Sequence, residues 1–92
     1  MKYTVKFEEG TLDNFHDAIS YYEKISDNLA DRFHDEFWAK IDTVKETPLH
    51  YQARYRNIRI AYTKTFPFSI HFLIEGTIIR ILKILHQKQY YK

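Results

Sequence analysis

The stretch FSIHFLIEGTIIRILKILH, residues 68–86, decides the fold of this chain. Its first part alternates large apolar residues with other residues, and this period of two predicts a strand with one buried face. Glu75-Gly76 then predicts a two-residue turn, after which residues 77–86 return as the second strand of an antiparallel hairpin. Such a turn would set His71 opposite Arg80, so that both side chains point to the same face of the sheet.

The segments around this hairpin extend the pattern. Residues 57–66 also alternate, which predicts a three-stranded antiparallel meander together with the two strands that follow. Residues 77–86 are apolar on both faces, as expected for a central strand. The period of two then divides the meander into a polar face and an apolar face that should pack into the core. The expected core face carries Ile58, Ile60, Ile70, Phe72, Ile74, Ile79, Ile81 and Leu85.

Two amphipathic helices are predicted before the meander. Thr11 can cap the first, and Asn28 can cap a second helix that Pro48 stops. The short connection between them requires an antiparallel hairpin. Residues 2–7 alternate like a strand. The expected fold class is therefore α+β in a single domain over residues 1–92, with an N-terminal strand, an antiparallel two-helix hairpin and a three-stranded antiparallel meander, the helices packed on one face of the sheet.

The composition favours a cytoplasmic protein with a basic surface. The 92 residues contain no cysteine, and we expect neither a signal peptide nor a membrane-spanning segment. Residues 1–49 hold six Lys or Arg against eleven Asp or Glu, whereas residues 50–92 hold eight against one. A division of this kind predicts an acidic surface and a basic surface, and the basic surface requires an anionic partner.

Polar residues on the expected open face of the sheet form the candidate site. Arg59, His71 and Arg80 would lie together there, with His86 at the end of the last strand. Two arginines can hold a phosphate or a carboxylate, and a histidine can transfer a proton near neutral pH. The alternative interpretation is that these residues only line a solvated sheet face.

Other chemistries lack a pattern in this sequence. The five histidines fall at no metal-ligand spacing, the two glycines cannot build a phosphate-binding loop, and no serine lies in a nucleophile motif. We therefore expect no metal site and no cofactor.

The chain resembles the RelE/ParE superfamily of toxins from bacterial type II toxin-antitoxin systems. The resemblance spans nearly the whole chain and rests on AISYYEKISDNLADRFHDEFWAKIDTVKETP, residues 18–48, and NIRIAYTKTFPFSIHFLIEGTIIRILKILHQK, residues 57–88. Its most recognisable parts are the paired tyrosines of the first helix, LADRF at the start of the second, the proline after it and the FPF…H ending. That ending is more similar to the ParE side of the superfamily.

The resemblance implies a growth-inhibiting toxin, of the kind that serves plasmid stabilisation, whose cognate antitoxin neutralises it. A ParE-like member would act by binding a protein target such as DNA gyrase. A RelE-like member would instead be an endonuclease that cleaves mRNA on the ribosome, and a third possibility is a member that has lost toxicity. Whether the chain is an enzyme therefore stays open between these branches.

The branches use different residues. In the nuclease branch the resemblance implies that Arg59 and Arg80 hold the scissile phosphate and that His71, His86 or Tyr90 handles protons. Residues 49–57 contain arginines but lack the lysines of that branch. For a binding surface, the residues expected to contact the partner are Arg54, Arg56, Lys83, Lys88 and Tyr91.

Overall fold

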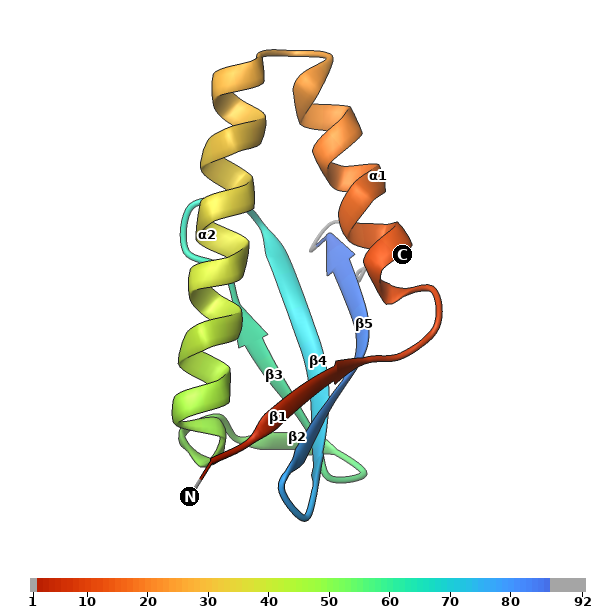
Figure 1. The fold of residues 1–92 in the computed structure, drawn as a ribbon, viewed down its shortest axis with the longest axis vertical. Coiled ribbons are helices and arrows are strands. Elements are labelled where there is room, and N and C mark those ends of the chain that lie inside the picture. Colours follow the sequence, from red (N-terminus) through yellow and green to blue (C-terminus); the bar gives the residue numbers. More distant parts are fainter. Residues whose placement is uncertain (1, 87–92) are drawn as a thin grey trace.

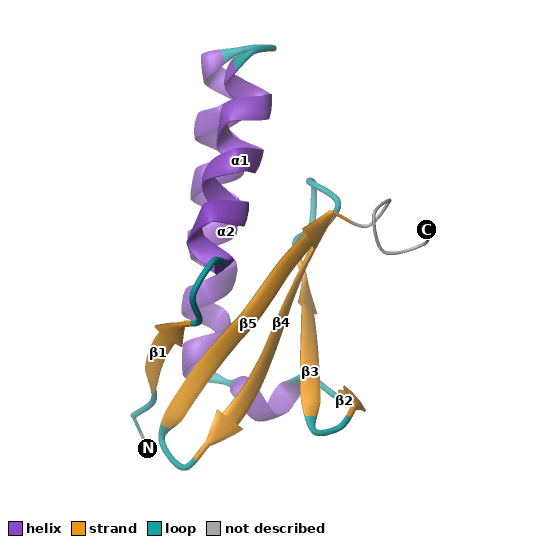
Figure 2. Ribbon diagram, turned by 90° about the vertical axis from the view of Figure 1, so that its right-hand side faces the viewer, coloured by secondary structure: helices purple, strands orange, loops and turns teal. Residues whose placement is uncertain are grey.

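A two-helix hairpin packs on one face of a five-stranded mixed sheet (Figures 1 and 2). The computed structural model describes residues 2–86. Its elements are, in chain order, β1 (Thr4–Phe7), α1 (Thr11–Glu23), α2 (Asp27–Glu46), a short 3-10 helix η1 (Pro48–His50), β2 (Ala53–Tyr55), β3 (Ile58–Tyr62), β4 (Phe68–Glu75) and β5 (Ile78–His86).

The sheet is larger than the meander predicted from the sequence. Its strand order is β1-β5-β4-β3-β2, so the predicted meander β3-β4-β5 forms its centre. β1 pairs with β5 in parallel, and β2 pairs with β3 antiparallel at the other edge. The α+β class and the helical hairpin are confirmed, whereas β2 and the parallel position of β1 were not predicted. Three residues are too short a run for the alternation that reveals a strand.

The helix starts differ from the predicted caps. α2 begins at Asp27, and its cap is Ser26, whose hydroxyl oxygen accepts a hydrogen bond from the Leu29 amide at 3.3 Å. Gly10 precedes α1 with a φ of 89°, a conformation that suits glycine. Thr11 is therefore the first residue of α1, and its hydroxyl donates to the Glu8 carbonyl at 2.6 Å.

The turn between β4 and β5 lies one residue later than predicted. Glu75 faces Ile78, so Gly76 and Thr77 form the turn, and Gly76 has a φ of 60°. As a result Arg80 faces Leu73 rather than His71.

A β-bulge at Leu82 inverts the faces of the last part of β5. Ile81 pairs with Phe72 and Lys83 pairs with His71, which leaves Leu82 as the inserted residue. Because one extra residue shifts side-chain parity, the residues beyond Leu82 exchange faces. Leu85, predicted to be core, pairs with Ser69 on the open side, while the ring of His86 packs against Phe68 on the helix side with centroids 5.1 Å apart.

The faces of β3 are also opposite to the prediction. Arg59 faces Phe72, and Ile60 faces His71. The helix-side core therefore receives Ala61, which faces Ile70, while Ile58 and Ile60 belong to the other face. Both parities of β3 carry apolar side chains, so the alternation alone could not determine which set the helices would cover.

Aromatic side chains fill the interface between the helical hairpin and the sheet. Phe15 and Phe37 lie with ring centroids 4.4 Å apart, and Phe33 contacts Phe68 at 4.9 Å. Phe33, Phe37 and Phe72 are completely buried. Because each aromatic ring buries roughly 150–250 Å², a short chain can assemble a sufficient core from them.

Glu36 attaches the loop between β3 and β4 to α2. Its carboxylate accepts hydrogen bonds from the backbone amides of Thr65, at 2.8 Å, and Phe66, at 3.0 Å. Partial burial would raise the pKa of this carboxyl, but the two amides outweigh that effect and lower the pKa below its usual value. The contact holds the ring of Phe66 between Tyr22 and Phe33 in the core.

Replacing Glu36 by alanine should therefore destabilise the fold. We expect Glu36→Ala to lower the unfolding free energy by about 1–2 kcal/mol at neutral pH, measured by urea denaturation, because two charge-assisted hydrogen bonds are lost. The difference from wild type should shrink as acid protonates the carboxylate. Asp31→Ala, an exposed acid on the same helix, is the control. Equal losses in the two variants would contradict the proposed role of Glu36.

Candidate functional site

The open face of the sheet is the side that the helical hairpin does not cover (Figure 2). β4 contributes Ser69, His71 and Leu73 to it, and β5 contributes Arg80 and Lys83. The polar residues of this face form two separate groups, one around His71 and one around Arg80.

His71 lies at the centre of a buried hydrogen-bonded chain. The hydroxyl of Tyr55, on β2, lies 3.0 Å from His71 Nδ1, and Ser69 Oγ lies 3.0 Å from His71 Nε2. The Ser69 hydroxyl donates in turn to the Leu85 carbonyl at 3.4 Å. Tyr55 thus reaches from the edge strand β2 across β3 to β4, and this contact ties the edge of the sheet to its centre.

These contacts define which nitrogen of His71 carries the proton. A hydroxyl has one hydrogen, and that of Ser69 points to Leu85, so Ser69 must accept the proton of His71 Nε2. Nδ1 is then the acceptor for the Tyr55 hydroxyl. In outline this hydrogen-bonded arrangement has the parts of a nucleophilic site, namely a serine, a histidine and a group that orients the histidine. Ser69 is only 3% exposed, however, and its hydroxyl is directed at a carbonyl, so it is not placed to attack a substrate.

The environment of His71 favours the neutral imidazole. Burial, together with the nearby charge of Lys83, lowers its pKa from 6.5 to about 4. Lys83 itself is exposed, and its Nζ lies 5.9 Å from the centre of the Tyr55 ring. A histidine with this pKa stays neutral near pH 7 and is poorly suited to proton transfer there.

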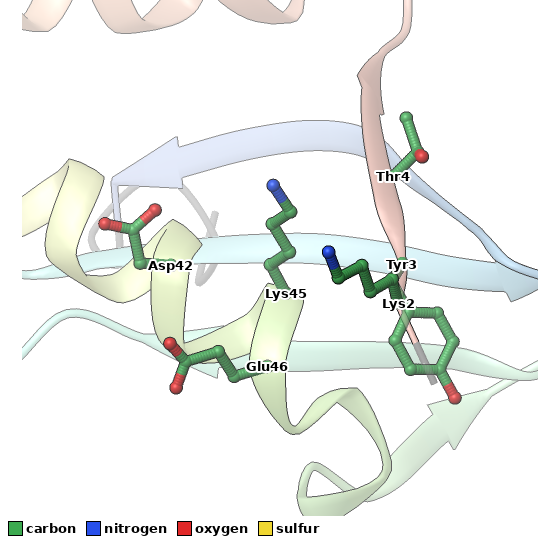
Figure 3. Close-up of a pocket in the computed structure, with 6 residues that line it drawn as sticks. All are labelled: Lys2, Tyr3, Thr4, Asp42, Lys45 and Glu46. Carbon is green, nitrogen blue, oxygen red and sulfur yellow. The ribbon is translucent and has the colours of Figure 1, made fainter.

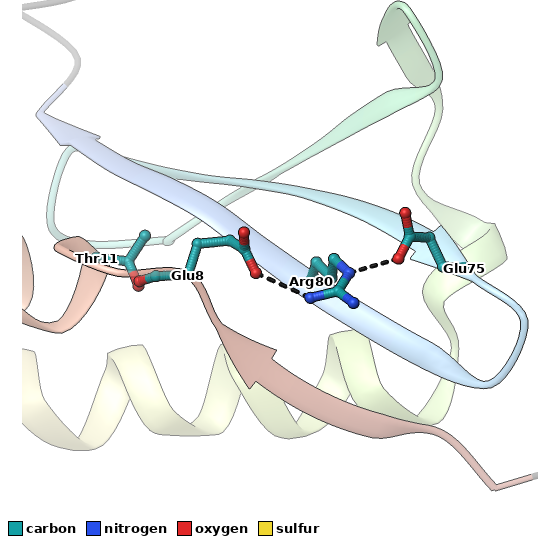
Figure 4. A network of polar contacts seen from close by, with 4 residues as sticks. All are labelled: Glu8, Thr11, Glu75 and Arg80. Atoms are coloured by element: carbon teal, nitrogen blue, oxygen red, sulfur yellow. Dashed lines mark hydrogen bonds and ion pairs between the residues drawn. The ribbon is translucent and has the colours of Figure 1, made fainter.

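Arg80 forms the centre of the second group (Figure 4). Its guanidinium donates through Nη1 to the Glu8 carboxylate at 3.0 Å and through Nε to the carboxylate of Glu75. The hydrogen bonds to Glu75 and Glu8 raise the pKa of Arg80 above its usual value. Because both carboxylates bond to this one guanidinium, the arginine stabilises the junction of β1, β4 and β5 rather than attracting an anion.

The predicted cluster of Arg59, His71 and Arg80 does not assemble. Arg59 lies on the helix side, where Nη1 donates to the Tyr51 carbonyl, and His86 is on that side too. His71 and Arg80 share the open face but belong to different groups. The shifted turn, the bulge and the register of β3 account for all three displacements. Lys88, Tyr90 and Tyr91 lie outside the described residues.

The exposed basic residues predicted for binding lie at the β2 edge and on β5. Arg54, Arg56 and Lys83 are all exposed. Arg56 and Asn57 connect β2 to β3, and both have positive φ values, 46° and 67°. We use the name basic hairpin for Arg54 and Arg56 of the β2–β3 hairpin together with Lys83 of β5. Lys83 is included because it lies over the ring of Tyr55, the residue between the two arginines in sequence.

A second feature is an open groove between the start of β1 and the end of α2 (Figure 3). Its charges are mixed, two lysines and two carboxylates, so it has no single electrostatic preference. The groove is lined by Lys2, Tyr3, Thr4, Asp42, Lys45 and Glu46.

Several residues of these groups were missed by the sequence reasoning. Glu8 was given no role, Glu75 was placed in the predicted turn, and Tyr55 lies in a segment for which no strand was predicted. Only Ser69 had a detectable signal, because a residue two positions from His71 on a strand shares its face. Within residues 2–86, no three His, Asp or Glu side chains gather into a metal site, and no helix there is long and apolar enough to cross a membrane.

Comparison with known proteins identifies a family and a shared fold. The family model described as ParE toxin of type II toxin-antitoxin system, parDE, matches residues 5–91. A solved structure, the chromosomal ParDE TA system from P. aeruginosa, matches with a TM-score of 0.81 over 92% of this chain and 96% of that chain, at 17% identity. At this identity the structural match supports the fold alone. No curated protein matches the chain in sequence.

The His71 environment predicts an acid-sensitive fold. Well above pH 6.5 His71 is neutral in both the folded and the unfolded chain, so its burial does not lower the unfolding free energy there. As the pH falls toward 4, only the unfolded chain gains the proton, and stability is lost. We expect the His71 contribution to lower the unfolding free energy by roughly 2 kcal/mol between about pH 7 and about pH 5.

Urea denaturation of variants isolates this contribution. His71→Gln should have a shallower pH dependence than wild type over that interval, whereas His50→Gln, at an exposed histidine, should keep the wild-type slope. A proton NMR titration of the wild-type imidazole provides a second measurement that does not depend on the variant folding. An imidazole that titrates near 6.5 would contradict the assignment.

Proposed function

The chain belongs to the ParE toxin family of type II toxin-antitoxin systems, and from this membership we propose that it arrests growth by binding a protein target such as DNA gyrase in the cytoplasm. We further propose that a cognate antitoxin neutralises it. The antitoxin would bind the toxin surface directly, with an acidic segment opposite its basic residues.

The arrangement of the polar groups supports binding rather than catalysis. A ribonuclease that uses the open face needs cations for the phosphate and a group that transfers protons near neutral pH. Here Arg80 is held by two carboxylates, His71 is buried and neutral, and Arg59 lies on the other face. The neutralisation of Arg80 by Glu8 and Glu75 is the observation that carries the proposal.

Induction of the toxin in growing cells separates the two modes of action. We expect growth arrest with intact mRNA, together with a rise in gyrase-linked DNA damage. Growth should recover when the same cells also produce the antitoxin. Cleavage of mRNA within ribosome-bound codons would overturn the proposal in favour of the RelE-like endonuclease. Normal growth after induction would indicate a member that has lost toxicity.

The purified protein provides a stoichiometric test. A toxin that acts by binding should inhibit gyrase supercoiling in proportion to the toxin-to-gyrase ratio, because each molecule occupies one target. An enzyme would act far below the concentration of its target through turnover. If the chain were instead the endonuclease, Arg80→Ala should lower mRNA cleavage by about 100-fold or more, since that is the typical loss on removing one charge-stabilising donor.

A further inference from the structure

The turn of the basic hairpin holds an arginine in an unfavourable backbone conformation. Two-residue hairpin turns with positive φ at both positions favour asparagine and glycine, because a side chain larger than theirs is strained in the left-handed region. Asn57, with a φ of 67°, fits this preference, whereas Arg56, with a φ of 46°, does not. An asparagine at position 56 would make the same turn with less strain. Strain of this kind at an exposed position indicates that the side chain serves a purpose other than folding.

The cations of the basic hairpin also lack compensation within the described chain. Among residues 2–86 the ion pairs to carboxylates involve Arg80 and His34. Residues 50–92 contain one acidic residue, Glu75, and its carboxylate forms an ion pair with Arg80. Arg54, Arg56 and Lys83 therefore face solvent as an unneutralised group, while most acids of the chain lie on the helical hairpin.

The hairpin is held in place by its central residue. Tyr55 is half-buried, its hydroxyl bonds to His71 on β4, and Lys83 lies over its ring. These contacts fix the backbone of the strand that carries the two arginines, which reduces the ordering cost of binding. A single-stranded nucleic acid would need an aromatic ring free for base stacking, whereas Lys83 already lies over the ring of Tyr55. The hairpin is therefore better suited to an acidic peptide than to RNA.

We propose that the basic hairpin is the contact surface for an acidic segment of the antitoxin. This inference rests on the proposed function, and it adds the place where the antitoxin is recognised. Exposed complementary charges act mainly on the association rate and on salt dependence, because attraction between separated charges guides the encounter and salt screens it. Antitoxin capture should therefore be fast at low salt and should slow as salt is added.

The test compares two doubly substituted toxins that lose the same charge. R54N/R56N removes two cations of the basic hairpin, and K6N/K24N removes two exposed lysines elsewhere. Binding to the purified antitoxin is measured by biolayer interferometry at low and high salt. We expect R54N/R56N to bind roughly tenfold more weakly at low salt, mostly through slower association, with the gap closing at high salt. K6N/K24N should stay within about twofold of wild type.

Two further measurements complete the test. Arg56→Asn should raise the thermal midpoint of the toxin, which shows that weaker antitoxin binding does not come from poor folding. The toxicity of R54N/R56N is also measured in cells that lack the antitoxin. Loss of toxicity with unchanged antitoxin binding would overturn the proposal and assign the hairpin to the target.

The remaining outcomes separate this inference from the proposed function. If wild type and R54N/R56N bind the antitoxin equally, or if both double variants weaken alike, the hairpin assignment is overturned and the toxin function stands. If the wild-type toxin neither arrests growth nor binds the antitoxin, the proposed function and this inference both fail. A loss of binding to labelled single-stranded RNA in R54N/R56N, with antitoxin binding intact, would also overturn it.

Discussion

Burial of one sheet face beneath the helical hairpin is the constraint on which the rest of this structure depends. A chain of 92 residues has a small core, and the hairpin supplies much of it through Phe15, Phe33 and Phe37. These rings require an apolar partner face, which β4 and β5 provide with Phe68, Phe72, Ile79 and Ile81. Every other side chain of the central strands must then lie on the open face. The placement of polar residues therefore follows from core packing rather than from function.

The bulge at Leu82 shows how strongly core packing controls the open face. Without it, β5 would place Leu85 in the core and His86 on the open side. The inserted residue brings Ile84 to the core and Lys83 to the open face, beside His71 and Tyr55. One inserted residue thus places the charge of Lys83 beside His71, where it adds to the effect of burial on the histidine pKa, and brings Lys83 into the basic hairpin. Bulges are common where a strand must redirect a side chain.

The two polar groups of the open face have opposite electrostatic character. Arg80 is neutralised by Glu8 and Glu75, and these ion pairs fasten the segment after β1 to the central strands. Arg54, Arg56 and Lys83 have no such carboxylates within the described residues, and their turn retains a strained arginine. An ion pair stabilises the fold in the first group, whereas the second group is suited to attract a partner. The chain belongs to the ParE toxin family, and we propose the antitoxin as that partner.

The sequence by itself determined the α+β class, the helical hairpin, the central antiparallel meander and the family, because these depend on local periodicity and on the order of the elements. It also showed the excess of basic residues after position 49. Only the tertiary structure decided which polar residues meet. A turn displaced by one residue, a bulge and the register of β3 each change which side chains share a face or face one another. None of the three could be predicted from the alternation of apolar residues, because both faces of β3 and of β5 carry apolar side chains. Contacts such as Tyr55 with His71 and Arg80 with Glu8 join residues distant in sequence, and pairings of that kind are set by the packing of the whole chain.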